Sequence, residues 1–252
     1  MKKSTKLYLA STLVAAALVS QNANAGCSDI SHAQLQNAAN AVLAAGNTGG
    51  FGLNMWATFV NETGNVCAVV NTGTKGRFSG NSQWLGSRVI SAQKANTGNA
   101  FSLDGVAISS GALFAAVQPG GSLYGLQESN PVDAQAAYKG NSNSFGKADD
   151  PLVGSRVGGI NVFGGGLPLY KNGKKIGGIG VSGDTSCTDH AFAWRMRTAL
   201  AAEPGAIAAF EVLTLGSVYD DLGKHPNCKY DSDIVDAAAS GLAAIPAPPP
   251  AP

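Results

Sequence analysis

The sequence has little charge of either sign. Only 13% of its 252 residues are Asp, Glu, Lys or Arg, and the formal net charge is +1. Proteins that bind nucleic acid or an anionic membrane surface usually carry a clear excess of Lys and Arg, so the composition excludes both as expected partners. Glycine, with 33 residues, is about twice as frequent as usual. A surface of small, uncharged residues favours self-association, and we expect a homo-oligomer.

The chain begins with an apolar stretch, residues 7–19, that is too short to cross a bilayer, which needs about 20 residues. Three lysines precede it, and Ala23-Asn24-Ala25 places small residues at the two positions that signal peptidase reads. A lipoprotein would use Cys27, but Asn24 stands where a lipid-attachment site carries Leu. We therefore expect a signal peptide over 1–25, a periplasmic or secreted protein, and no membrane span in the mature chain. Loss of the three lysines gives that mature chain a net charge of −2.

Four cysteines follow the expected cut: Cys27, Cys67, Cys187 and Cys228. An even number in an oxidising compartment predicts disulfides. Of three pairings, we favour Cys27–Cys67 and Cys187–Cys228, because each ties one end of the chain, which would otherwise fray, to the body of the protein. The sequence has no C-x-x-C, which disfavours structural metal and thioredoxin-like sites. A catalytic thiol at Cys187, near a helix start that lowers a thiol pKa, remains an alternative.

Apolar periodicity and capping residues predict the elements of the fold. Ser31 and Gln34 form a capping box, and Asp184 or Thr185 can cap the last helix. Helices are expected over 31–46, 83–96, 109–117 and 186–202. Strands are expected over 53–60, 66–70, 158–163, 167–170 and 175–181. The polar stretch 119–154 predicts a long loop.

These elements predict an α+β fold. Consecutive hairpins cannot form a parallel sheet, so we expect a single, mostly antiparallel five-stranded sheet covered by helices, close to a profilin- or PAS-like arrangement. The expected domain covers 26–204 and is followed by a C-terminal extension over 205–244. The proline-rich end, 245–252, has too little to bury and should be disordered.

A glycine motif lies between the last strand and the last helix. Residues 178–183 match G-x-G-x-x-G, and Glu203 follows twenty residues later, as in a dinucleotide fingerprint. That interpretation is disfavoured because Glu203 falls at a helix end and the unit follows hairpins. We favour the interpretation that these glycines permit close packing between neighbouring segments. The backbone N–H groups over 183–186 would then be able to hold a carboxylate. A catalytic triad of Ser182 with Asp189-His190 is disfavoured, since neighbouring helix residues point about 100° apart.

Three histidines are present, His32, His190 and His225, and no two have metal-ligand spacing on one helix face. A zinc site is therefore disfavoured. Each imidazole alone could ligate a haem iron, although a surface or capping role is the commoner one. His190 lies one turn before Trp194, and Arg195, which follows, could pair with a propionate or be a solvated charge.

The run GGINVFGGGLPLY over 158–170, then KIGGIGVSG over 175–183, then Asp189-His190-Ala191 resembles the GlcG/HbpS family, which includes the C-terminal domain of PduO-type proteins. Upstream, 61–66 resembles the family's hairpin, with Asn61 where Asp is usual. Residues 91–97 resemble a family helix and single out Lys94. The resemblance covers about residues 30–200.

The resemblance implies a helix-covered antiparallel sheet, homo-oligomers, and haem binding or degradation. Some members use a His on the first helix, which points to His32. We expect an exported haem-binding protein for storage, scavenging or sensing. The candidate iron ligands are His32 and His190, and the other candidate ligand-binding residues are Lys94, Ser182, Gly183, Asp184 and Arg195.

Two alternatives remain open. One is an enzyme acting on a small organic acid or other metabolite, with Ser182-Gly183-Asp184 as an anion cradle and Lys94 as its electrostatic partner. The other is an oligomeric scaffold without a ligand.

Overall fold

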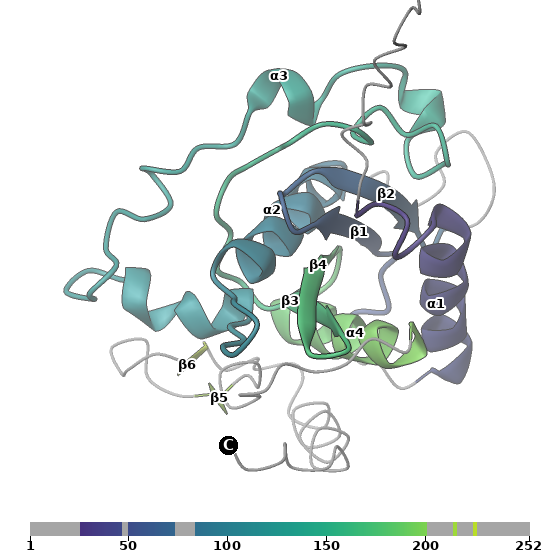
Figure 1. Cartoon of the computed structure of the whole chain (residues 1–252). Helices are drawn as coiled ribbons and strands as arrows, with labels where there is room; N and C mark the ends of the chain where they lie inside the picture. The colour runs from purple at the N-terminus through teal and green to yellow at the C-terminus, as the bar shows by residue number, and fades with distance from the viewer. Residues whose placement is uncertain (1–25, 47–49, 74–83, 201–213, 216–223, 226–252) are drawn as a thin grey trace, which may run out of the picture.

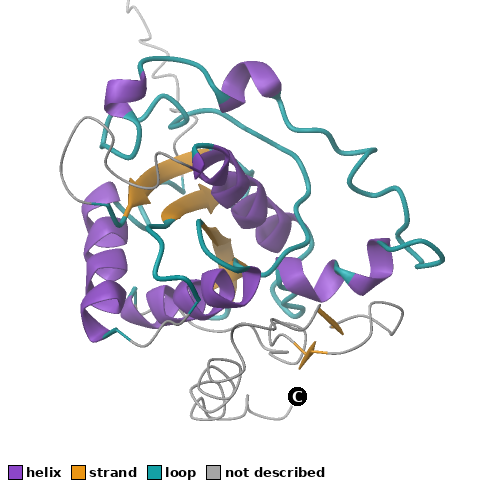
Figure 2. Cartoon of the chain, turned by 180° about the vertical axis from the view of Figure 1, so that it is seen from behind, coloured by secondary structure: helices purple, strands orange, loops and turns teal. Residues whose placement is uncertain are grey.

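A four-stranded antiparallel sheet lies at the centre of the fold, with helices on both faces (Figures 1 and 2). The structure, a computed structural model, describes residues 26–46, 50–73, 84–200, 214–215 and 224–225. The expected signal peptide, Glu203, Cys228 and the proline-rich tail lie outside these ranges. Within them, no helix is long and apolar enough to cross a membrane.

The sheet is built from two hairpins. Its strands are β1 (Trp56–Asn61), β2 (Val66–Asn71), β3 (Gly166–Lys171) and β4 (Lys174–Ser182), in the order β2-β1-β4-β3. Asn172 and Gly173, both with positive φ, form the tight turn between β3 and β4. The α+β class and the antiparallel sheet predicted from the sequence are confirmed.

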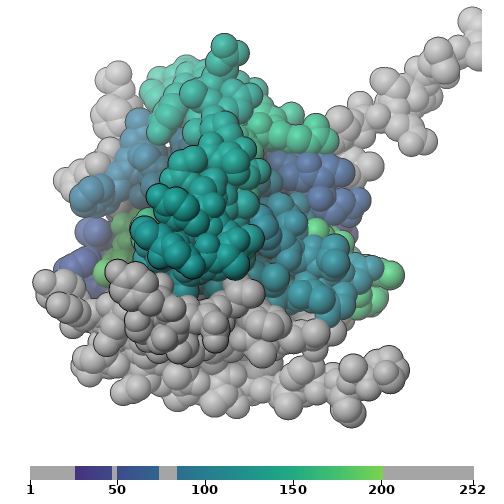
Figure 3. Space-filling view, turned by 90° about the vertical axis from the view of Figure 1, so that its left-hand side faces the viewer, coloured from purple at the N-terminus to yellow at the C-terminus, as the bar shows by residue number. Residues whose placement is uncertain are grey.

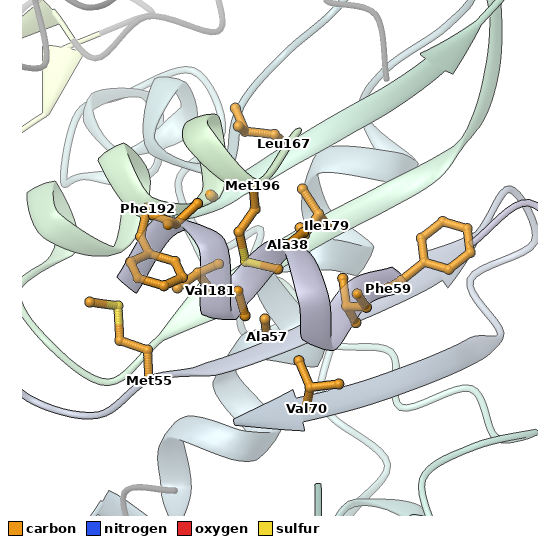
Figure 4. Packing of buried hydrophobic residues seen from close by; sticks show 14 of the residues in the cluster. Ala38, Met55, Ala57, Phe59, Val70, Leu167, Ile179, Val181, Phe192 and Met196 are labelled. Atoms are coloured by element: carbon orange, nitrogen blue, oxygen red, sulfur yellow. The ribbon is translucent and has the colours of Figure 1, made fainter. Parts of the chain in front are cut away.

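The two faces of the sheet bury different helices. Helices α1 (His32–Ala45) and α4 (Ser186–Ala199) cover one face, and α2 (Gly86–Ala100) covers the other. Alternate residues of β1 follow this division: Ala57 and Phe59 point towards α1 and α4, whereas Trp56 and Val60 belong to the cluster under α2. Figure 4 shows the first cluster, in which Phe192 and Met196 of α4 meet residues of β1 and β4.

Glycines of β4 allow α2 to lie directly against the sheet. A Cβ at Gly180 would overlap the carbonyl oxygen of Ser91, and one at Gly178 would overlap that of Ala95. A Cβ at Gly183 would overlap the carbonyl oxygen of Asn54. The G-x-G-x-x-G motif thus serves packing, mostly against α2 rather than at the turn into α4, and its antiparallel sheet is not a dinucleotide-binding βαβ unit.

The prediction of a fifth strand over 158–163 is wrong. Gly158 and Gly159 have positive φ. Within 158–163, all of which the structure describes, only Gly158 forms a β-bridge, with Val132. Side chains of α2 satisfy the backbone instead, because Asn96 donates to the carbonyl of Gly159 and Thr97 accepts from the N–H of Asn161. With its polar groups bonded to a helix, the stretch has no need of a sheet partner.

Two other predicted elements differ in detail. Residues 109–117 form two 3-10 turns, η2 (Ser110–Leu113) and η3 (Ala115–Val117), instead of one α-helix, and the side chain of Ser109 caps the first. The first strand begins at Trp56 and not at residue 53, because the N–H groups of Phe51 and Leu53 donate to Asp184. The remaining short pieces are α3 (Ala134–Ala137), η4 (Ser142–Ser144), β5 (Thr214–Leu215) and β6 (Lys224–His225).

The polar stretch 119–154 has little regular structure, as predicted, and runs across one side of the molecule (Figure 3). A buried ion pair fixes it to α2: Arg88 donates to both carboxylate oxygens of Asp150 and to the carbonyl of Ala137. The guanidinium also lies 3.7 Å from the ring centre of Phe145. This buried ion pair therefore anchors the long segment together with Ala137 and Leu152, which belong to the apolar cluster under α2.

The predicted disulfide between Cys27 and Cys67 is present, with 5.1 Å between the Cα atoms, and joins the chain before α1 to β2. Cys187 is also disulfide-bonded, so it is not a free catalytic thiol. Its predicted partner, Cys228, lies outside the described residues.

Candidate functional site

A cavity of about 300 Å³ lies beside the turn from β4 into α4. It lies between α2, this turn and the segment that leads into β1. Its lining comprises Phe51, Leu53, Trp84, Ser87, Ile90, Lys94, Phe163, Ser182, Gly183, Asp184, Thr185, Ser186 and Asp189.

A buried ion pair forms the charged part of this cavity. Lys94 of α2 lies with its Nζ 2.7 Å from Oδ2 of Asp189 on α4, and both side chains are at most 3% exposed. Lys94 also donates to the carbonyl of Val181, 3.1 Å away. The pair thus joins α2, β4 and α4 in the buried part of the cavity lining.

Burial raises the pKa of Asp189 to about 6. The loss of water around the carboxylate is the largest cause, and the negative charge of Asp184 acts in the same direction. Lys94 opposes both, through its charge and its hydrogen bond. A carboxyl group with a perturbed pKa, facing a cavity and paired with a specific cation, is a recognised sign of a functional site.

The triple-glycine turn, Gly164–Gly166, lies against this pair. A Cβ at Gly165 would overlap the carbonyl oxygen of Val181 and lie 3.1–3.2 Å from carbon atoms of Asp189 and Lys94. Its N–H donates to Nδ1 of His190, 3.3 Å away. The glycine-rich turn therefore shields the ion pair from solvent.

Asp184, another residue of the cavity lining, holds neighbouring backbone segments in place. Its carboxylate accepts the N–H groups of Phe51, Leu53 and Thr185 at 2.7–3.1 Å. The segment before β1 is thereby held against the start of α4, and the negative charge of Asp184 is offset by backbone dipoles.

Aromatic side chains form the rim. Phe51, Trp84 and Phe163 come from three separate segments and are 62%, 54% and 45% exposed. Large aromatic residues are usually well buried, so three exposed rings around one cavity provide flat apolar faces for a ligand.

The structure brings together only some of the residues predicted for the site. Lys94, Ser182, Gly183 and Asp184 all line the cavity. The other three candidates, His32, His190 and Arg195, do not line the cavity, and they lie on the two helices of the opposite face. His32 contacts the carbonyl of Gly146, His190 the N–H of Gly165, and Arg195 the carbonyl of Gly46. The side chain of His225 is outside the description.

The backbone cradle predicted over 183–186 is already used in part by the protein itself. The N–H of Asp184 donates to Oδ1 of Asp189, and the N–H of Thr185 donates to the carboxylate of Asp184. Among the described residues, the hydroxyl groups of Ser182 and Ser186 have no hydrogen-bond partner, and both line the cavity. Anion binding here would therefore rely on side chains more than on main-chain N–H groups.

Sequence analysis missed two features of this site. The sequence motifs give Asp189 no binding role, although the family-like segments 91–97 and 189–191 contain both partners of the ion pair. The aromatic rim gave no signal, because Phe51, Trp84 and Phe163 are far apart in sequence.

The lining suits some parts of a haem better than others. Its aromatic faces match a porphyrin ring, and Lys94 with the serine hydroxyls matches a propionate. Haem iron is usually held by His, Cys, Met or Tyr, and none of these types lines the cavity within the described residues. The same ranges contain no group of three or more His, Cys, Asp or Glu able to hold a metal ion.

Comparison with known proteins gives a family match over most of this fold. The family described as "Haem degrading protein HbpS-like" matches residues 30–197. An uncharacterised 15.0 kDa protein from the dhaT–dhaS intergenic region of Citrobacter freundii is 41% identical over 70 residues. That alignment spans 28% of this chain and 31% of the relative's length.

Three solved structures are similar. Protein ORFY of Klebsiella pneumoniae shares 25% identity over 69% of this chain and 92% of its own, with a TM-score of 0.46. A structure described as a PduOC–haem complex shares 21% sequence identity over 69% of this chain and 94% of its own, with a TM-score of 0.46. A double mutant of Streptomyces reticuli HbpS shares 15% sequence identity over 78% of this chain and 97% of its own, with a TM-score of 0.40.

Proposed function

This chain belongs to the HbpS-like family, and on that premise we propose that it is an exported haem-binding protein whose site is the cavity beside the β4–α4 turn. The observation that carries the proposal is the combination of three exposed aromatic rings with a buried cation in one cavity. A haem presents the matching chemistry, since it joins a flat apolar ring to two carboxylates.

The residues of this chain would hold haem through its ring and its propionates. Phe51, Trp84 and Phe163 would contact the porphyrin, and each aromatic contact contributes about 0.5–1.5 kcal/mol beyond the area that it buries. Lys94 and the hydroxyls of Ser182 and Ser186 would donate hydrogen bonds to a propionate. Bound haem would supply redox-active iron. None of the described lining residues is a His, Cys, Met or Tyr that would ligate this iron.

Export and self-association are parts of the same proposal. The Cys27–Cys67 disulfide supports an oxidising compartment, where such bonds form and persist. N-terminal sequencing of the protein recovered from cell fractions should begin at Gly26. Light scattering during size-exclusion chromatography should give a mass of several chains, and a mass of one chain would exclude the homo-oligomer.

A hemin titration tests the binding proposal. The purified mature protein should give a sharp Soret band that saturates at one equivalent per chain. Trp84→Ala and Phe163→Ala should each weaken hemin binding at least about fivefold, from the loss of one aromatic contact. Tyr124→Ala is the matched control, because Tyr124 is 69% exposed and does not line the cavity.

Two results would refute the proposal. A spectrum of free hemin at all ratios would exclude haem binding. Equal affinity in the rim variants, combined with a loss of the Soret band in His32→Ala or His190→Ala, would place the haem elsewhere.

A further inference from the structure

The ammonium group of Lys94 has a hydrogen-bond donor to spare. A lysine ammonium carries three N–H groups, and the described residues provide two acceptors, Oδ2 of Asp189 at 2.7 Å and the carbonyl of Val181 at 3.1 Å. The side chain is 98% buried, and an unused charged donor is costly at such a site. Since Lys94 lines the cavity, an oxygen atom of a bound molecule can take the third N–H.

The nearby charges decide which oxygen is preferred. Asp189 shares the ammonium, so a second anion must compete with it. Asp184 is compensated by three backbone N–H groups and repels an anion less than a bare carboxylate would. The cavity also faces the first turn of α4, a 14-residue helix whose dipole favours negative charge at this end.

We propose that the cavity binds a small aromatic carboxylate, whose carboxylate accepts the third N–H of Lys94 while its ring lies against the aromatic rim. The hydroxyls of Ser182 and Ser186 supply further donors to the same group. A volume of about 300 Å³ is at the lower end for small-molecule pockets, so a single-ring acid fits inside the cavity, whereas a porphyrin would extend beyond it over the exposed rings of the rim. The inference rests on the proposed function for its choice of cavity, and its test separates the two.

Calorimetric titration of the full chain with benzoate and benzamide tests the inference. The two probes have the same shape and differ in charge. Benzoate should bind at least about tenfold more tightly, because a hydrogen bond between two charged groups is the stronger one. Equal affinities, or no benzoate binding, would overturn the proposal.

Two variants assign the interaction to Lys94. Lys94→Met should remove the preference for benzoate over benzamide, and Lys174→Met, which removes an exposed lysine outside the cavity, should retain it. Asp189→Asn removes the competing carboxylate and should raise benzoate affinity at least about fivefold. This second variant decides the question if Lys94→Met does not fold, and benzoate affinity unchanged by Asp189→Asn would contradict the shared-cation account.

The carboxylate inference and the haem proposal fail separately. A chain that gives the Soret band but ignores benzoate retains the haem proposal and loses this inference. A chain that binds benzoate through Lys94 but gives only the spectrum of free hemin retains this inference and loses the haem proposal.

Discussion

The Lys94–Asp189 pair makes a quantitative prediction about stability. Lys94→Met leaves an unpaired carboxylate in a position where burial already raises its pKa to about 6. Removing one partner of a buried ion pair typically costs about 3–5 kcal/mol, whereas replacing both partners is often nearly neutral. We therefore expect Lys94→Met to lower the free energy of unfolding by about 3–5 kcal/mol at pH 8. The double variant Lys94→Met/Asp189→Asn should lose much less, since the Asn oxygen can still accept the N–H of Asp184.

Urea denaturation followed by circular dichroism measures these differences. The wild-type chain, Lys94→Met, Asp189→Asn and the double variant together form a double-mutant cycle. The exposed pair Lys174–Asp104 is a matched control, because its 2.8 Å separation is nearly the same but its side chains are 77% and 51% exposed. Surface pairs contribute little, so its cycle should show no coupling above experimental error. The reasoning is refuted if Lys94→Met is as stable as the double variant at pH 8.

Three further predictions concern the fold. Because the pKa of Asp189 rises from its ordinary value of 3.8 to about 6 on folding, its carboxyl group favours the folded state at low pH, and the wild-type chain should lose roughly 2 kcal/mol relative to Asp189→Asn as pH rises from 4 to 7; parallel stability curves would contradict this. Gly180→Ala should lower the melting temperature sharply, since its Cβ overlaps α2, whereas Gly105→Ala, with open space at its Cβ, should change it little; equal shifts would exclude the packing role. Cys27→Ser, which opens the disulfide to Cys67 across a separation of 40 residues, should cost about 4 kcal/mol in urea unfolding; Cys27→Ser/Cys67→Ser should show the same loss, and a wild-type urea midpoint in both variants would contradict the stabilising role of this bond.

Much of the fold could be predicted because its signals are local. The capping box at Ser31, the Asn172-Gly173 turn and the apolar periods of three helices each depend on a few neighbouring residues, and all are present. The stretch 158–163 has the composition of a strand, but its glycines and the side chains of α2 decide its structure. That decision depends on a helix some sixty residues earlier in the chain, which no local pattern records.

The site was predictable only where one motif contained it. Ser182, Gly183 and Asp184 are consecutive, and the resemblance singles out Lys94; these four residues line one cavity, and their role in binding stays a prediction. The burial of Asp189 beside Lys94 and the meeting of three aromatic rings at the rim depend on tertiary structure, so no sequence motif contains them. The histidines are candidate iron ligands for their chemistry and, at His32, from the resemblance as well, but the fold places His32 and His190 away from the cavity lining.

A crystal structure of the mature protein grown with haem is the most direct test of the account. We expect a porphyrin against Phe51, Trp84 and Phe163, with a propionate within hydrogen-bond distance of Nζ of Lys94. A porphyrin ligated by His32 or His190 away from this cavity, with Lys94 still bonded only to Asp189 and Val181, would contradict it.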